Sequence, residues 1–385
     1  MDEQTPFFRP QIGEAELAAV RDVLTSGWLT SGPRAGEFES AFAAYVGCDH
    51  AVAVASGTAA LLLSLEALGV GPGDEVLIPT LTFAAAAAVI CQLGARPVLV
   101  DCLPDALTLD PVDLKRRITP RSHVIMPMHY GGRPCAMDPI IEIARGHGLA
   151  IVEDAAHALP AEYRGRRVGS IGEATCFSFY ANKPITTGEG GMVTTNSADI
   201  ARRVRLMAHH GLDRSVPTRT GARQSWRYDI VAPGYKANLS DIAAALGLRQ
   251  LERCDAFQSA RERCATRYAA ALAGVPGVQA PSFDPDSRSA WHLYVVQIDS
   301  DALAIERDAV CERLASAGIA SSVHYLPLHM HPYYRDALGH RPGDLPNATR
   351  AYDRMLSLPI FPDLADEAID RAVLALGDIL RTNRR

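Results

Sequence analysis

The sequence lacks any hydrophobic run that could cross a membrane. Its longest apolar stretch, residues 83–90, is far shorter than the roughly 20 residues that a transmembrane helix requires. The first residues, Met-Asp-Glu-Gln-Thr-Pro, contain neither the basic nor the apolar region of a secretion signal. We therefore expect a cytoplasmic protein with no membrane-spanning segment.

Paired cysteines are also missing. The eight cysteines are scattered, and none belongs to a CxxC pair. This pattern is typical of reduced thiols in a cytosolic protein, and it excludes the usual spacings of structural zinc sites. The cysteines are at positions 48, 91, 102, 135, 176, 254, 264 and 311.

The sequence has no excess of positive charge and very little lysine. The formal net charge is −6, the isoelectric point is near 6.1, and no basic run alternates with aromatic residues. These features argue against a nucleic-acid partner. The only lysines are Lys115, Lys183 and Lys236, so most of the basic residues are arginine. Internal repeats and low-complexity tracts are absent as well.

What the sequence does contain is an alternation of short apolar runs and helical stretches between residue 50 and about residue 195. Continuous apolar strands separated by helices predict a mainly parallel sheet that is covered on both faces, which is an α/β architecture. The predicted strands are 51–55, 75–78, 97–100, 124–126, 150–152, 175–179 and 192–195, and the predicted helices are 58–68, 83–93, 110–117 and 138–147.

The C-terminal part has a different pattern, in which strands and helices segregate in the manner of a small α+β lobe. A chain of 385 residues is too long for one ordinary core, so we predict two domains. The large domain would comprise residues 1–245, including an N-terminal arm, and the small domain residues 246–385. The predicted elements of this part are a long helix at 239–273, a strand at 292–298 and helices at 304–317 and 364–381.

A segment with a different composition separates these two regions. Segment 211–236 contains Gly, Pro, Arg and Trp with little periodicity. We expect a long loop there, and loops of that length are usually functional or lie at an interface.

Lys183 has the least surface-like context of the three lysines. It follows the apolar strand 175–179 and precedes Pro184 and a glycine-rich stretch that leads into another strand. A lysine in a tight, partly apolar turn is desolvated, and desolvation favours the neutral amine, the form that attacks an aldehyde carbon. The sequence therefore indicates a Schiff-base lysine, with an ordinary surface lysine as the alternative.

Residues suited to pyridoxal phosphate accompany this lysine. The pyridine nitrogen of that cofactor needs a carboxylate that keeps it protonated. Asp154 lies where the buried strand 150–152 ends, and open α/β sheets bind their ligands at such positions. Asp154 could instead cap a helix, but its place about thirty residues before Lys183 favours the cofactor role.

The phosphate group of such a cofactor needs backbone N–H groups at the start of a helix. Ser56, Gly57 and Thr58 join strand 51–55 to the following helix and supply a hydroxyl group and a flexible backbone. The alternative is a simple helix cap, because many helices begin with Ser or Thr. Phe83 could stack its ring on the pyridine or belong to the core.

Six motifs in order make the sequence resemble the DegT/StrS-type sugar aminotransferases, a branch of the aspartate-aminotransferase fold. The resemblance covers nearly the whole chain and implies fold type I of the pyridoxal-phosphate enzymes, with a large α/β lobe and a smaller C-terminal α+β lobe. The motifs are Ser26-Gly-Trp-Leu-Thr-Ser-Gly-Pro33, Ser56-Gly-Thr-Ala-Ala60, Glu153-Asp-Ala-Ala-His157, Phe177-Ser-Phe-Tyr-Ala-Asn-Lys183-Pro-Ile-Thr-Thr-Gly-Glu-Gly-Gly-Met192, Gly234-Tyr-Lys-Ala-Asn-Leu-Ser-Asp241 and Leu356-Ser-Leu-Pro-Ile-Phe-Pro362.

The resemblance implies pyridoxal 5′-phosphate as the cofactor and a role for each matching residue. Lys183 would hold the cofactor and move the proton, Asp154 would pair with the pyridine nitrogen, and His157 would lie near the ring hydroxyl. Phe83 would stack on the ring. The phosphate would be held by Gly57, Thr58, Ser178 and, from the neighbouring subunit, Asn238. Because Asn238 serves the other subunit, the resemblance implies an obligate homodimer with shared active sites.

Within this family, the runs Lys183–Met192 and Met126–Gly131 resemble enzymes that aminate C4 of the sugar, such as those that form perosamine and 4-amino-arabinose. The implied reaction moves an amino group from L-glutamate to a nucleotide-linked 4-keto-6-deoxy sugar. Dehydratases of the family have histidine in place of the lysine, so Lys183 argues against dehydration. Ala158-Leu-Pro160 departs from the Gly/Ala stretch that commonly follows His157. We expect this departure to change the shape of the site wall beside that residue.

Four residues are expected near the sugar, namely Trp28, Thr30, His324 and His329. The two histidines fall where relatives approach the sugar, and Trp28 and Thr30 belong to the first motif. Metal binding by the two histidines together with His331 is the alternative. No carboxylate or cysteine completes a ligand set, so we predict no metal site.

Other functions stay open at this point. The protein could aminate C3 of the sugar, or it could catalyse another pyridoxal-phosphate reaction such as dehydration or decarboxylation. A regulatory or binding protein could also keep the fold without turnover, since fold does not establish function. The intact pair of Lys183 and Asp154 weighs against that last alternative.

Overall fold

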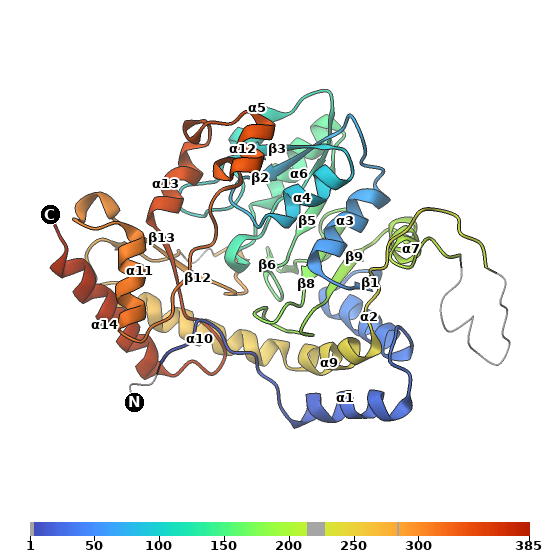
Figure 1. Ribbon diagram of the computed structural model, residues 1–385, viewed down its shortest axis with the longest axis horizontal. Coiled ribbons are helices and arrows are strands. Elements are labelled where there is room, and N and C mark those ends of the chain that lie inside the picture. The colour runs from blue at the N-terminus through green and yellow to red at the C-terminus, as the bar shows by residue number, and fades with distance from the viewer. Residues whose placement is uncertain (1–3, 214–227, 283–284) are drawn as a thin grey trace.

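A seven-stranded sheet forms the centre of the larger part of the molecule (Figure 1). The computed structural model describes residues 4–213, 228–282 and 285–385. In spatial order the strands are β1 (His50–Val54), β9 (Gly191–Thr195), β8 (Ala174–Ser178), β5 (Ala150–Asp154), β4 (Ser122–Ile125), β2 (Glu75–Pro79) and β3 (Arg96–Val100). Only β9 runs against the others within this sheet, so the prediction of a mainly parallel sheet in an α/β fold is confirmed.

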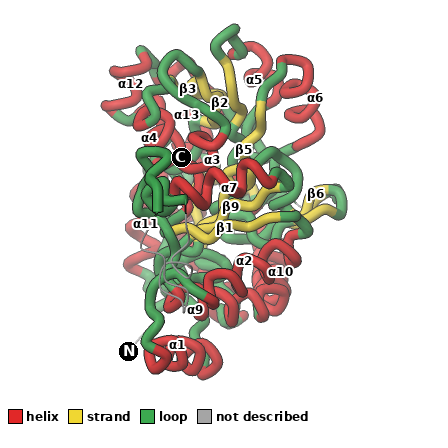
Figure 2. The backbone as a smooth tube through the Cα atoms, turned by 90° about the vertical axis from the view of Figure 1, so that its right-hand side faces the viewer, coloured by secondary structure: helices red, strands yellow, loops and turns green. Residues whose placement is uncertain are grey.

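Helices cover both faces of this sheet (Figure 2). They are α2 (Pro33–Val46), α3 (Gly57–Ala67), α4 (Ala85–Gln92), α5 (Pro111–Arg117), α6 (Met137–His147) and α7 (Ala198–Met207). Val76 and Ile78 of β2 belong to the hydrophobic cluster that side chains of α3, α4 and α7 also form, whereas Leu77 belongs to a separate cluster with side chains of α5 and α6. Successive side chains of a strand point to opposite faces, so a strand covered on both faces is a continuous apolar run. This is the pattern that made the strands predictable.

The predicted single helix at 239–273 is two helices. The first, α9 (Asp241–Glu252), packs against α2 and α1 (Glu14–Ser26), and α10 (Cys254–Leu272) follows it. Arg253 between them has φ −101° and ψ 0°, and its guanidinium donates to Glu16 Oε1 at 2.7 Å. An ion pair with α1 therefore holds the chain at the break between the two helices.

The C-terminal part has its own antiparallel sheet and its own core. The strands lie in the order β10 (Val278–Gln279), β12 (Tyr294–Ile298) and β13 (Met355–Leu358), and the covering helices are α10, α11 (Arg307–Ser316) and α14 (Asp366–Thr382). Tyr268, Tyr294 and Leu376 belong to this core, which is separate from the clusters around the large sheet. The division into domains 1–245 and 246–385 stays a prediction.

Some elements were not predicted. Two-residue strands are too short to show periodicity, and the helices at 332–338 and 346–354 each begin with proline. These elements are α1, α2, α7, β13, α12 (Pro332–Leu338), α13 (Pro346–Arg354) and a small sheet of β11 (Ser287–Arg288), β6 (Glu162–Tyr163) and β7 (Arg166–Arg167). Within the predicted loop 211–236, residues 214–227 lie outside the described residues.

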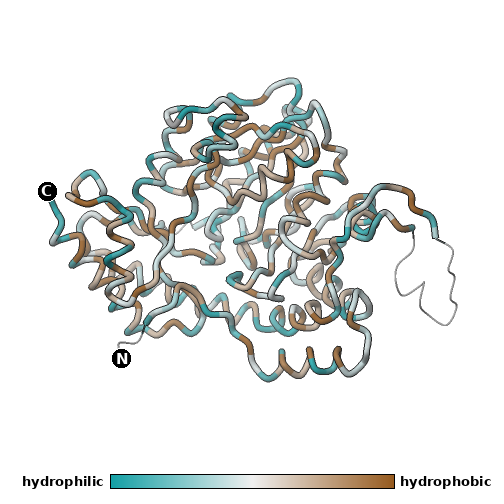
Figure 3. Tube along the Cα trace, viewed as in Figure 1, coloured by the Kyte–Doolittle hydropathy of each residue, from teal (hydrophilic) through white to brown (hydrophobic). Residues whose placement is uncertain are grey.

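Hydropathy follows this layering (Figure 3). Hydrophobic residues run along the strands of the large sheet, between the helices that cover it. Among the helices of the described ranges, none is both long enough and apolar enough to span a bilayer.

The carboxyl ends of the parallel strands lie at one edge of the large sheet. At this edge β5 ends at Asp154, β8 ends at Ser178 and β1 leads through Ser56 into α3. Ligands of open α/β sheets bind at such an edge.

Candidate active site

Lys183 lies in the turn that connects β8 to β9. Its backbone N–H donates to the Tyr180 carbonyl oxygen at 2.9 Å, and the N–H of Thr187 returns to the Phe179 carbonyl at 3.0 Å. Burial lowers the pKa of the Lys183 amine to about 8, while the negative charge of Asp154 acts in the opposite direction. About a tenth of this amine is therefore neutral and nucleophilic at pH 7, far more than for an ordinary lysine.

Asp154 ends β5 and is almost completely buried, with 4% of its surface exposed. Its backbone N–H donates to the Pro127 carbonyl at 2.9 Å, and its Oδ1 accepts from the N–H of Ala156 at 3.1 Å. Burial raises the pKa of the carboxyl, and the charge of Lys183 lowers it. Within the described residues this carboxylate has one hydrogen bond, so it can accept a cationic partner.

The start of α3 is shaped as an anion cradle. Ser56 caps the helix by accepting from the Ala59 N–H at 3.1 Å, and the first N–H groups of a helix have no partner within it. A Cβ added at Gly57 would lie 2.8 Å from the Ser178 Cβ, so only glycine lets the two segments lie this close. The Ser178 hydroxyl group thus belongs to the same corner as Gly57 and the exposed Thr58.

His157 is buried and held from two sides. The Gly131 N–H donates to His157 Nδ1 at 3.2 Å, and Nε2 lies 3.1 Å from the Tyr325 hydroxyl. Because Nδ1 accepts, the proton of the neutral imidazole is on Nε2 and is donated to Tyr325. Burial, and then the charge of Lys183, hold the pKa of His157 well below its usual range. The ring centroid of His292 is 4.3 Å away.

Tyr325 was missed by the sequence analysis, although it adjoins the predicted residue His324. It joins several site residues, because its hydroxyl binds His157 and its ring centroid lies 5.7 Å from that of Phe83. Phe83 is 55% exposed, which leaves its ring available to a ligand. The stacking of Phe83 on a pyridine ring stays a prediction.

The ring of His324 is edge-on to that of Tyr325, with centroids 5.0 Å apart. Its Nδ1 lies 2.9 Å from the Ser357 hydroxyl, and the Tyr130 hydroxyl donates to its carbonyl oxygen. Burial, and then the charge of Lys183, lower the pKa of His324 to about 4. The structure thus brings His324 into the group around Lys183, and its imidazole is neutral at neutral pH.

His329 has a different environment. It is fully buried, with Nδ1 2.8 Å from the Thr80 hydroxyl and Nε2 3.1 Å from the Thr349 hydroxyl. Both ring nitrogens are thus engaged by the protein, which favours a supporting role. A contact with the sugar stays a prediction.

The remaining predicted residues form a second group around Ser31 and Asp241. Asn238 Nδ2 donates to the Ser31 hydroxyl at 2.6 Å, and Trp28 Nε1 donates to the Ser31 carbonyl at 3.3 Å. The Asp241 N–H donates to the Thr30 carbonyl at 3.3 Å. Within the described residues, no hydrogen bond or ring contact joins this group to Lys183 or Asp154.

This second group does touch the strand that leads to the cradle. The backbone of Asn238 pairs with Val54, and the Ala55 N–H donates to the Ala237 carbonyl at 2.7 Å. A cavity of about 320 Å³ opens beside Asn238, with Ser31 among its lining residues.

A buried pair next to Asp154 was also missed by the sequence analysis. His129 Nε2 lies 3.0 Å from Glu153 Oε2, and Glu153 Oε1 accepts from the Thr175 hydroxyl at 2.7 Å and from the Gly172 N–H at 2.9 Å. The backbone N–H of His129 donates to the Asp154 carbonyl at 3.0 Å. The pair therefore braces the end of β5, where Asp154 is placed.

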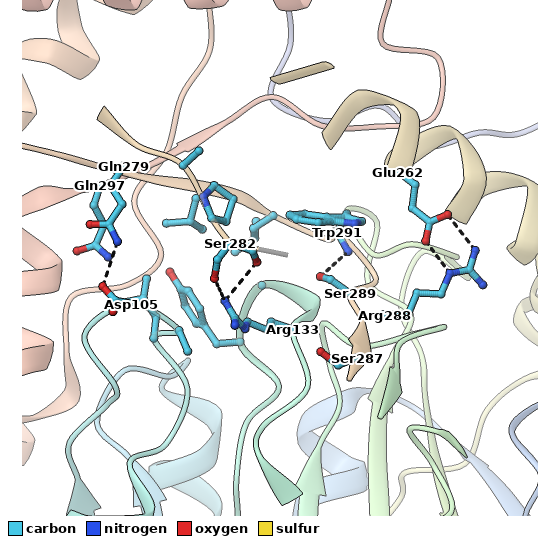
Figure 4. A pocket seen from close by; sticks show the side chains of 18 of the residues that line it. Asp105, Arg133, Glu262, Gln279, Ser282, Ser287, Arg288, Ser289, Trp291 and Gln297 are labelled. Atoms are coloured by element: carbon cyan, nitrogen blue, oxygen red, sulfur yellow. Dashed lines mark hydrogen bonds and ion pairs between the residues drawn. The ribbon is translucent and has the colours of Figure 1, made fainter. Parts of the chain in front are cut away.

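A cavity of about 360 Å³ adjoins this site without including any predicted site residue (Figure 4). Gly131 lines it and also binds His157. Arg133 projects into it and donates to the Ser282 hydroxyl at 3.0 Å, while Arg288 pairs with Glu262 at 2.6 Å. The predicted reacting groups thus lie outside this cavity.

Known proteins are similar to this chain over nearly its whole length. The model of the DegT/DnrJ/EryC1/StrS aminotransferase family matches residues 10–377. The spore coat polysaccharide biosynthesis protein SpsC of Bacillus subtilis (strain 168) is 45% identical over 377 residues, which cover 98% of this chain and 97% of that protein.

Two solved structures are also similar to this chain. Spr1654 from Streptococcus pneumoniae in its PLP form has 35% sequence identity and a TM-score of 0.91, with 98% of this chain and 99% of that chain covered. DesV of S. venezuelae, in complex with a ketimine intermediate, has 36% identity and a TM-score of 0.89, with the same shares covered. The predicted fold type is confirmed by these structures.

Proposed function

Because the chain belongs to the DegT/DnrJ/EryC1/StrS aminotransferase family, we propose that it transfers the amino group of L-glutamate to C4 of a nucleotide-linked 4-keto-6-deoxy sugar in the cytoplasm. Enzymes of this family depend on pyridoxal 5′-phosphate, so the predicted cofactor is confirmed. They act on a sugar and glutamate and are typically dimeric. The 4-keto substrate, the nucleotide and the shared site are our proposal.

The observation that carries this proposal is the electrostatic pairing of Lys183 with Asp154. Asp154 ends β5, and Lys183 lies in the turn that follows the neighbouring strand β8. The charge of each residue shifts the pKa of the other. A neutral lysine next to a buried carboxylate is the pair that amino-group transfer requires. A protein that had kept only the fold would have no need to bury these two groups together.

The residues present fit pyridoxal phosphate, which when bound supplies an electron sink for the carbon that loses its proton. Asp154 would accept the N–H of the pyridine ring, and this cation would favour the ionised carboxylate that burial disfavours. Gly57 and Thr58 would direct backbone N–H groups at the phosphate, and Ser178 would donate its hydroxyl. Two observations support this fit. Gly57 lies so close to Ser178 that no side chain would fit between them, and among the described residues the Asp154 carboxylate accepts a single hydrogen bond.

We assign proton movement to Lys183. In the first half-reaction its neutral amine would take the proton from the carbon of glutamate that bears the amino group. In the second it would deliver a proton to the sugar carbon that receives the amine. His157, with its proton on Nε2 and Tyr325 as partner, would orient the ring hydroxyl without gaining charge.

The second group, Trp28, Thr30 and Asn238, is proposed to complete the site of a neighbouring subunit. No hydrogen bond or ring contact among the described residues joins it to Lys183, and a dimer with two-fold symmetry would bring each such group to the partner's sheet edge. The sugar would then lie between His324 of one chain and Trp28 of the other.

A panel of substrates tests this proposal. The protein, loaded with cofactor and supplied with glutamate, is incubated with UDP-, dTDP- and GDP-linked 4-keto-6-deoxyhexoses and with their 3-keto isomers. Mass spectrometry identifies an amino sugar, and NMR locates the amine. We expect amination at C4 and poor use of 3-keto sugars, because about 1 Å of misplacement can cost roughly a hundredfold. Faster amination at C3 would overturn the position, and loss of water instead of amination would overturn the reaction.

A further inference from the structure

Residues 4–13 form a strap that runs from the C-terminal part of the molecule to α9, along the lower edge of Figure 1. At one end the Thr5 N–H donates to the Gly318 carbonyl at 2.8 Å, and the Ala320 N–H donates to the Thr5 carbonyl at 3.0 Å. At the other end Gln250 Nε2 donates to the Gln11 carbonyl at 2.7 Å. Both ends of the strap are therefore fixed.

Phe7 lies between these two anchors and stacks on His324. The ring centroids are 5.4 Å apart and the planes are inclined by 23°. The next residue, Phe8, is 39% exposed and makes no ring contact within the described residues. Of the two adjacent phenylalanines of the strap, Phe7 contacts His324 and the more exposed Phe8 does not.

The partners of His324 show which of its atoms is left for a ligand. Nδ1 is engaged with the Ser357 hydroxyl, and Nε2 has no hydrogen-bond partner within the described residues. A neutral imidazole with one available ring nitrogen suits a hydroxyl group, which can donate or accept. Sugars carry such groups around the ring, whereas glutamate offers carboxylates, which can only accept.

The two substrates differ in how far they extend from the carbon that reacts at Lys183. His157 contacts the Tyr325 hydroxyl, the ring of Tyr325 contacts the ring of His324, and the ring of Phe7 stacks on the other side of this series, on His324. Glutamate is a short chain whose reacting carbon must reach Lys183, whereas a hexose linked to a nucleotide extends much farther from its own reacting carbon. Phe7 therefore reaches a ligand of this site only through His324, and the longer acceptor extends farther toward that residue than glutamate does.

We propose that Phe7 is a specificity-determining residue for the keto-sugar acceptor, because its stack fixes the His324 imidazole in the wall that the hexose faces. This inference rests on the function proposed above. It adds the N-terminal strap to the site and assigns to it the recognition of the acceptor rather than of the donor. Phe7 acts through His324 and is a positioning residue.

The test separates the two half-reactions of Phe7→Ala, Phe7→Tyr and Phe8→Ala in the cofactor-loaded enzyme. The glutamate half-reaction is followed by absorbance without a sugar, and the acceptor half-reaction with the 4-keto-6-deoxyhexose that the wild type uses best. An aromatic pair of this kind corresponds to a change of roughly 3–10-fold. We expect Phe7→Ala to raise KM for the sugar by that factor and to leave the glutamate half-reaction within about twofold. Phe7→Tyr should retain the wild-type KM, and Phe8→Ala should match the wild type in both.

A second readout needs no turnover. In protein labelled with ¹⁵N-histidine, Phe7→Ala should shift the ring signals of His324, and Phe8→Ala should leave them unchanged. Equal losses in both half-reactions of Phe7→Ala, or no loss in either, would overturn the inference while the proposed function stands. If the wild type aminates no sugar of the panel, the proposed function falls, and the inference falls with it.

Discussion

The group around Lys183 and the group around Asn238 differ in how they are held. The first lies at the ends of buried strands, and Asp154 and His157 are almost completely buried. The second lies on loops beside α1 and α9, with Thr30 exposed and Trp28 partly exposed. Under the proposed dimer, one chain assembles the residues for the chemistry and a second copy closes the site. This difference predicts that substitutions in the first group disable one subunit, whereas those in the second disable its neighbour.

The largest effect is expected for Lys183→Ala. Without the amine, no group in the turn can hold the cofactor or move the proton, so turnover should fall by about 10⁴-fold or more. Borohydride reduction of the yellow wild type should fix the cofactor on Lys183, as read by peptide mass spectrometry. Lys115→Ala, on the exposed side of α5, is the matched control and should keep full activity. A label on another residue would contradict the assignment.

Asp154→Ala should come next. The ring nitrogen would lose the anion that keeps it protonated, and turnover should fall by about three orders of magnitude. Cofactor binding should persist in part, because the cradle at Gly57 and Ser178 is intact. Absorbance measures the bound cofactor and a coupled assay the turnover. Near-normal turnover would show that Asp154 is not the pyridine partner.

A mixture of Asn238→Ala and Lys183→Ala chains tests the comparison itself. Each variant alone should be nearly inactive. If Asn238 acts across the interface, one site of each mixed dimer has both defects and the other has neither. Random exchange makes half of the dimers mixed, so about a quarter of all sites should be intact. Recovery of about a quarter of wild-type activity is expected. No recovery, with exchange demonstrated by mass spectrometry, would place Asn238 in the site of its own chain.

The smallest effect concerns the stability of the cofactor-free protein. Burial lowers the pKa of Lys183 from 10.5 to about 8, so between these values the unfolded chain binds a proton that the folded chain does not. Stability should therefore rise with pH across this window. Well below pH 8 both states are almost fully protonated, and burying the charged amine costs about 3 kcal/mol, since each pKa unit corresponds to about 1.4 kcal/mol. Lys183→Met removes this cost. The variant should therefore have a larger free energy of unfolding than the wild type at pH 7, and this difference should shrink by pH 10. Urea unfolding at several pH values measures this, and a constant difference would mean that the amine is not desolvated.

The sequence predicted the central strands because strands covered on both faces are continuous apolar runs. It predicted Lys183 and Asp154 because both follow such strands directly. Tyr325 and the pair of His129 and Glu153 escaped, since their partners are far away along the chain or on a neighbouring strand. The helix break at Arg253 escaped for the same reason, because the residue that pairs with Arg253 there is Glu16 of α1, far away along the chain. Local patterns thus predict where strands end, and long-range contacts decide which side chains meet there.

The antiparallel strand β9 has a consequence for the order in which the protein acquires its site during synthesis. Strand β1 is at the edge of the sheet, and its partner in the sheet is β9. On the ribosome, β1 must therefore wait until the chain has been made as far as Thr195. The corner between Gly57 and Ser178 can close only then, and Asn238 pairs with Val54 later still. Contacts this distant in the chain form slowly and leave edges exposed meanwhile. A nascent chain that ends before β9 should therefore not bind the cofactor.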